Sequence, residues 1–172
     1  MLATKSQPKP FTNSGFTLPE TIAVAIIIGI VAAIAVPSLL GFWRQQRVKT
    51  ALVETTGAIK EAQRQAMRQG RLCRVNIEPS SNQITGSPSN CLLSNRFLDS
   101  AIVIRTNLSG TPPNIAFSYK GTTTKSGTIV ISSNFTNLQK CFVISLGTGI
   151  SRTGNYTGSP TGNVSASNCQ RD

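Results

Sequence analysis

The strongest constraint on the fold of this chain is an uncharged stretch of 23 residues, Thr21 to Trp43, that directly follows a single acid, Glu20. Its central part, Ile22 to Val36, is almost entirely isoleucine, valine and alanine. A helix of this length, at about 1.5 Å per residue, crosses the roughly 30 Å hydrocarbon core of a bilayer. A carboxylate at the mouth of such a helix is costly unless a cation pairs with it. The sequence therefore predicts a membrane-spanning helix whose acid requires a cation, most simply a free amine on another copy of the same kind of chain.

The residues on either side of this stretch distinguish it from a cleaved secretory signal. Lys5 and Lys9 precede it, as they would in such a signal, but the apolar run is long and no cleavage site of small residues follows it. Trp43 and Arg44 stand at its far end, where an aromatic side chain and a cation reaching toward the headgroups are expected. We therefore expect the stretch to stay in the protein as an anchor.

The helical pattern continues beyond the apolar stretch. Apolar and small residues recur at alternating spacings of four and three: Val48, Leu52, Thr55, Ile59, Ala62 and Ala66. This period predicts an amphipathic helix with basic residues and glutamine on its other faces. Gly70 is the expected terminator, so one helix should run from about Thr17 to Gln69. Pro37 should bend it, whereas Pro19 falls in the first turn, where a missing N–H costs little.

Composition disfavours catalysis. Histidine is absent, and the six acids form no local cluster. The commonest general base, the commonest metal ligand and paired-carboxylate chemistry are therefore missing. We predict that the chain is not an enzyme and has no cofactor or metal site. The net charge of +11 favours anionic partners, namely lipid headgroups, nucleic acid or acidic proteins, without choosing among them.

The four cysteines indicate disulfides. Cys73, Cys91, Cys141 and Cys169 include no C-x-x-C pair, and without histidine they do not resemble a zinc site. An even number of cysteines in a loop-rich domain suits an oxidising compartment. Three pairings are possible, and we prefer Cys73–Cys91 with Cys141–Cys169 because each closes a short local loop.

The N-terminus resembles that of type IV prepilins. The matching residues are a short hydrophilic leader, Gly15, the sequence Phe16-Thr17-Leu18, Glu20 and the apolar run that follows. Pro19 stands where a branched apolar residue is usual in that family. The resemblance covers about the first forty-five residues. It implies four segments, which are a leader peptide (1–15), a transmembrane and assembly half of the helix (16–43), an amphipathic half (44–70) and a head (71–172).

The resemblance also implies how the chain would be processed and placed. Prepilin peptidase would cut after Gly15 and methylate the new amine of Phe16, and Glu20 would neutralise the Phe16 amine of a neighbouring subunit. The helix would be a single-pass anchor in the inner membrane with the head in the periplasm or outside the cell, and the subunit could enter a surface pilus. Positive-inside counting of Arg44 and the basic residues after it favours a cytoplasmic head instead. We follow the processing and disulfide arguments, which require it outside.

The head has short β-type segments separated by turn signals. The expected strands are Leu72–Ile77, Gln83–Thr85, Ala101–Thr106, Ile115–Tyr119, Thr128–Ser132 and Lys140–Leu146. The fold class we predict is α+β, with a long N-terminal helix packed on a small antiparallel β-sheet. The tail Ser151–Asp172 should be loose unless Cys169 ties it down. The order of elements resembles minor pilins and pseudopilins of the GspH/FimT group.

That group leaves two functions to consider. The first is a structural minor pilin or pseudopilin of a type IV pilus or a type II secretion filament, whose partners are other subunits, prepilin peptidase and membrane lipid. The second is a DNA-binding minor pilin for DNA uptake. Some FimT-like proteins bind DNA through a G-R-x-R element, and the corresponding stretch here is Gly149-Ile150-Ser151-Arg152, so only Arg152 carries over. Lys140 is a further candidate for phosphate contacts, and solvated surface is the simpler interpretation of both cations.

Overall fold

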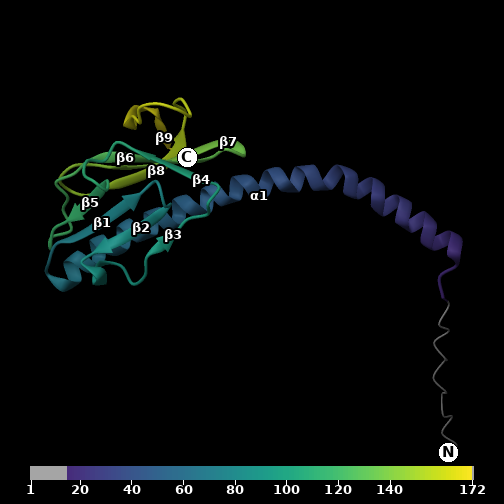
Figure 1. Cartoon of the computed structure of the whole chain (residues 1–172), viewed down its shortest axis with the longest axis horizontal. Helices are drawn as coiled ribbons and strands as arrows, with labels where there is room; N and C mark the ends of the chain where they lie inside the picture. Colours follow the sequence, from purple (N-terminus) through teal and green to yellow (C-terminus); the bar gives the residue numbers. More distant parts are fainter. Residues whose placement is uncertain (1–14, 172) are drawn as a thin grey trace, which may run out of the picture. The chain divides into compact units, whose positions relative to one another are not determined.

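The computed structural model describes residues 15–171, and its first element is helix α1, Leu18–Gln69 (Figure 1). The Thr17 carbonyl accepts hydrogen bonds from the backbone N–H groups of Glu20 and Thr21, both at 3.1 Å, and so begins the helix. Gly70 ends it with a φ of +62°, a left-handed conformation that glycine adopts without strain. The Arg71 N–H then donates to the Ala66 carbonyl at 3.2 Å. These bounds confirm the predicted helix to within one residue.

The chain divides into two compact units, with the boundary inside α1 between Leu39 and Leu40. In the first unit, the large apolar side chains of α1 from Leu18 to Leu39 are exposed around the whole helix. In the part of the chain that the structure describes, α1 is the single helix long and apolar enough to cross a membrane. Its apolar window is unburied, unlike the core helix of a soluble protein, so its length and composition suit a single membrane anchor.

The second unit, from Leu40 onward, combines the rest of α1 with two antiparallel sheets (Figure 1). The first sheet has the order β3-β2-β1-β5, with β1 at Cys73–Glu78, β2 at Gln83–Ser87, β3 at Arg96–Phe97 and β5 at Asn114–Phe117. The second has the order β4-β6-β7-β8-β9, with β4 at Ile102–Thr106, β6 at Gly127–Ser133, β7 at Thr136–Ile144, β8 at Ser151–Tyr156 and β9 at Cys169–Arg171. Together they give the predicted α+β class, although the sequence predicted one sheet.

The main core lies between α1 and the sheets. The six helix positions picked out by the spacing of four and three are all buried: Val48, Leu52, Thr55, Ile59, Ala62 and Ala66. They pack with fully buried strand residues that include Val75, Ile115 and Phe142. The prediction of an amphipathic second half of the helix is therefore confirmed. Apolar burial of this kind supplies most of the stability of a domain.

A second, smaller core covers the other face of the second sheet. Val130, Cys141 and Val143 point away from the main core and are covered by Tyr156 and Cys169. Central strands β6 and β7 are consequently buried on both faces. The sequence of a strand buried on both faces is a nearly continuous apolar run and does not alternate between apolar and polar residues.

Three strands were not predicted, and each has a physical reason. β3 is two residues long, and β8 and β9 are polar segments within the tail. β8 pairs with β7, and β9 pairs with β8, so the tail is part of the sheet. Glycine at position 154 allows β9 to approach β8 closely, because a Cβ at this position would overlap the carbonyl oxygen of Gln170.

Two disulfides hold the head. Cys73 on β1 is bonded to Cys91 at the end of a short 3-10 helix, Ser89–Cys91, and Cys141 on β7 is bonded to Cys169 on β9. This is the pairing preferred from loop length. The sequence predicted a loose tail unless Cys169 was bonded to the rest of the head. The Cys141–Cys169 disulfide provides that bond.

Candidate assembly site

The residues at the predicted junction of leader and helix are exposed. Gly15 and Phe16 precede the first turn of α1, and the Phe16 side chain is 75% exposed. A Cβ added at Gly15 would meet no heavy atom within 4 Å. Its lack of a side chain is therefore not required by packing in this structure. The residues of the predicted leader before Gly15 lie outside the described residues.

Glu20 lies in the first turn of α1 and is exposed. Among residues 15–171, ion pairs within 4.0 Å join Arg47 to Asp99 and Arg96 to Glu61, and none includes Glu20. The free N–H groups of a helix start favour a negative charge, but they do not supply a formal positive charge. The acid at the start of the apolar helix is thus left for a cation from elsewhere.

The surface around Glu20 suits contact with other helices or with lipid. Phe16 and four helix residues enclose a shallow apolar hollow: Thr21, Val24, Ala25 and Ile28. The large side chains further along the helix are exposed on every face. An apolar surface of this extent is unfavourable in water and marks a membrane or protein contact. Geometrically, the site is one carboxylate at the edge of a continuous apolar surface.

A second acid, Glu61, has a role in the head that the sequence analysis did not assign. Glu61 is buried beside the core face of α1. Its carboxylate accepts a hydrogen bond from the Leu93 backbone N–H at 2.6 Å and forms an ion pair with Arg96 at 3.0 Å. It thereby fastens the segment between β2 and β3 to the helix. The signal in the sequence was its position one residue before Ala62 in the buried stripe.

Replacing Glu61 by alanine should lower the free energy of unfolding by about 2–3 kcal/mol, because the Leu93 N–H and the partly buried Arg96 guanidinium lose their acceptor. Glu61→Gln should cost less, since it keeps an acceptor for Leu93. Thermal unfolding of the full chain in detergent measures both. Glu54→Ala, on the same helix but outside both ion pairs, is the control and should unfold within about 0.5 kcal/mol of wild type.

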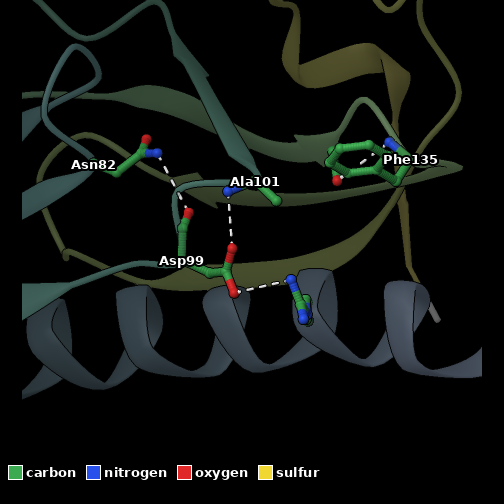
Figure 2. A network of polar contacts seen from close by, with 6 residues as sticks. Asn82, Asp99, Ala101 and Phe135 are labelled. Carbon is green, nitrogen blue, oxygen red and sulfur yellow. Dashed lines mark hydrogen bonds and ion pairs between the residues drawn. The ribbon is translucent and has the colours of Figure 1, made fainter. Parts of the chain in front are cut away.

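A second polar network joins the helix to the loop before β4. Arg47 pairs with Asp99 at 3.3 Å, and the same carboxylate accepts the Ala101 N–H at 2.8 Å. The side chain of Asn82 donates to the Asp99 carbonyl at 3.4 Å (Figure 2). It also donates to the Ile102 carbonyl at 2.7 Å. These contacts fasten the segment before β4 to α1 at Arg47.

The two candidate DNA-contacting cations do not share a surface. Arg152 on β8 donates to the carbonyl oxygens of Cys169 and Ala166, both at 2.9 Å, and so holds the tail. Lys140 on β7 is only 9% exposed. Arg152 is opposite Val143 in the ladder, and Val143 is three residues from Lys140, so the two cations project from opposite faces of the sheet. The structure gives Arg152 a structural contact, and DNA binding stays an untested prediction.

Comparison with known proteins identifies the fold. Neither a protein-family model nor a curated protein sequence matches the chain. Among solved structures, the type IV minor pilin FimU of Pseudomonas aeruginosa matches 66% of this chain and 91% of its own, with 16% identity and a TM-score of 0.51. The minor pseudopilin EpsH of the Vibrio cholerae type 2 secretion system matches 66% of this chain and 94% of its own, with 13% identity and a TM-score of 0.44. The long apolar helix packed against antiparallel sheets is the type IV pilin-like α+β fold.

Proposed function

We propose that this chain is a minor pilin or pseudopilin, a structural subunit of a type IV pilus or type II secretion filament. The observation that carries the proposal is the combination at the start of α1. One acid without an ion-pair partner among the described residues precedes a helix half that is apolar on every face, and the same helix continues into a pilin-like head. A monomer in water would not tolerate this surface, whereas a membrane or a bundle of like helices covers it.

The proposed processing follows from the chemistry at the junction. Hydrolysis of the Gly15–Phe16 peptide bond by prepilin peptidase would release the leader and create an amine on Phe16, which the enzyme would then methylate. A methylated secondary amine keeps its positive charge, so it still complements a carboxylate. In the filament, Glu20 of one subunit would pair with the Phe16 amine of a neighbour. A pair inside an apolar bundle is tolerated when each charge satisfies the other, and this disfavours packing out of register.

The proposed location is the inner membrane, with the head on the outer side. Two features support it: the apolar first half of α1 and the two disulfides, which persist in oxidising compartments. Before assembly the subunit would be anchored by its helix. Its partners would be other subunits of the filament and the lipid of the inner membrane.

Intact mass and N-terminal sequencing of the protein purified from its membrane test the proposal. We expect a chain that begins at Phe16, carries one added methyl group and lacks four hydrogens because of the two disulfides. Gly15→Val should keep the leader, because a side chain there obstructs the peptidase while meeting nothing within 4 Å in this structure. A mature chain that retains the leader in cells with active peptidase would contradict the proposal.

A further inference from the structure

An exposed aromatic side chain of the head lies beside Trp43 and Arg44, where the uncharged stretch of the helix ends. Phe135, in the turn between β6 and β7, is 59% exposed. The guanidinium carbon of Arg44 lies 5.7 Å from the centre of its ring. Figure 2 shows Phe135 beside the Asp99 network, above the helix. A hollow of about 250 Å³ separates the turn from α1, and its lining includes Leu40, Trp43, Arg47 and Ser133.

The position of this turn along the chain is informative. Trp43 is the last residue of the uncharged stretch and Arg44 is the first charge after it. If the stretch crosses the membrane, both residues lie at the boundary between hydrocarbon and headgroups. Phe135, although ninety-one positions later in the chain, is held at the same level by its contact with Arg44. Trp43 is also exposed, so neither aromatic ring is covered by the head.

The charges beside the turn complement an anionic surface. Arg44, Arg47 and Lys49 carry three positive charges here, and Asp99 opposes one of them through its ion pair with Arg47. Guanidinium groups donate several N–H bonds to phosphate oxygens and also lie favourably over aromatic rings. Aromatic rings with an adjacent cation are typical of the interfacial region of a bilayer. The aromatic ring in the turn and the cations on the helix beside it thus both suit the headgroup region of a bilayer.

We infer that Phe135, Trp43 and Arg44 form a second contact of the head with the membrane surface, hereafter the membrane foot. In this arrangement the rings of Phe135 and Trp43 enter the headgroup region and Arg44 binds lipid phosphate. The inference rests on the proposed membrane anchoring through α1. One helix leaves a head free to tilt and rotate above the bilayer, whereas a second point of contact restricts both motions. Entry into a filament would then require the foot to leave the lipid.

Tryptophan fluorescence tests the membrane foot, because Trp43 is the single tryptophan of the chain. The test variant is Trp43→Phe with Phe135→Trp, in the full chain. It is reconstituted in vesicles of phosphatidylethanolamine and phosphatidylglycerol whose acyl chains are brominated near the headgroup. Bromine quenches only an indole that reaches the upper part of the bilayer. We expect the indole at position 135 to lose emission intensity as Trp43 of the wild type does, and Arg44→Gln to weaken that loss.

The control variant is Trp43→Phe with Tyr119→Trp. Tyr119 is 57% exposed, nearly as much as Phe135. Like Phe135 it has a cation over its ring, because the Lys120 ammonium lies 5.5 Å from the ring centre. Tyr119 belongs to the other end of the head. Two residues after it, the Gly121 carbonyl accepts a hydrogen bond from Gln63, and a Cβ added at Gly121 would meet the Met67 side chain. From Arg44 to Met67 the helix rises about 35 Å at 1.5 Å per residue. The indole at 119 should keep its emission.

The outcomes separate the foot from the anchoring on which it rests. If Trp43 is quenched while the indole at 135 behaves like that at 119, the foot is wrong and the anchoring stands. If Trp43 of the wild type is not quenched either, the anchoring and the proposed function fail together. If the indole at 135 is shielded from a soluble quencher only as protein concentration rises, and bromine has no effect, a second subunit covers the turn and the lipid contact is overturned.

Discussion

Replacing Glu20 by alanine should abolish incorporation of the protein into filaments while leaving it folded and bound to the membrane. The described part of the chain offers this carboxylate no ion-pair partner, and Glu20 belongs to a different compact unit from the head, so its removal should not disturb the head. In an apolar helix bundle the neighbour's Phe16 amine would be left without its counter-charge. Leaving one member of a buried ion pair alone costs roughly 3 kcal/mol or more, which is about 100-fold or more in subunit affinity.

The measurement is the amount of the protein in filaments sheared from cells compared with the amount left in the membrane fraction. For a secretion filament that stays in the envelope, cross-linking to neighbouring subunits replaces shearing. Glu54→Ala is the matched control, since it removes an acid from the same helix outside the assembly half, and it should leave incorporation unchanged. Equal incorporation of Glu20→Ala and wild type would overturn the role assigned to this acid. Thermal unfolding of both variants in detergent verifies that their heads are folded.

Removing the disulfide between Cys141 and Cys169 should release the C-terminal part of the head. The bond closes a loop with a sequence separation of 28 residues. Opening a loop of this size lowers the free energy of unfolding by about 3–4 kcal/mol in the chain-entropy model. The structural change should be largest around β9, because this strand pairs with β8 over three residues and is otherwise held by contacts such as the two hydrogen bonds that Arg152 donates to the Cys169 and Ala166 carbonyls.

Hydrogen exchange on the Cys141→Ser, Cys169→Ser variant measures this effect. We expect the largest increase in exchange rate in β8 and β9, and a smaller increase in β1 and β2 that reflects the lower global stability. Removing Cys73 and Cys91 instead should destabilise the whole head, because both of these side chains belong to the main core. If the Cys141 and Cys169 variant kept wild-type protection in β9, the strand pairing alone would hold the tail and the role given to the disulfide would be wrong.

The helix could be predicted from the sequence because the signals for it lie close together in the chain. The uncharged stretch, the spacing of four and three and the terminating Gly70 each depend on neighbours within two turns. The structure places the helix at Leu18–Gln69 and buries all six predicted core positions. The junction at Glu20 was readable for the same reason, since a charge beside an apolar run requires no knowledge of the fold to be recognised as costly.

The arrangement of the head was less accessible. The division into two sheets, the pairing of β7 with β8 and the strand β9 depend on contacts between residues far apart in the chain. β8 contains Ser, Arg, Thr, Gly and Asn, so its composition indicated a loop. It is a strand because its neighbours on both sides supply hydrogen-bond partners. The roles of Glu61 and Arg152 are likewise set by backbone groups that the fold brings to them.

The sequence alone determined the apolar helix, its uncompensated acid Glu20, the amphipathic continuation and the class of fold, because each follows from the order of side chains along one helix or strand. Only the tertiary structure decided that the tail completes a sheet, that Arg152 and Lys140 lie on opposite faces, and that Phe135 lies next to Arg44. The physical reason is that these relations join segments that are distant in the chain, and the packing of strands on the helix selects which of them meet.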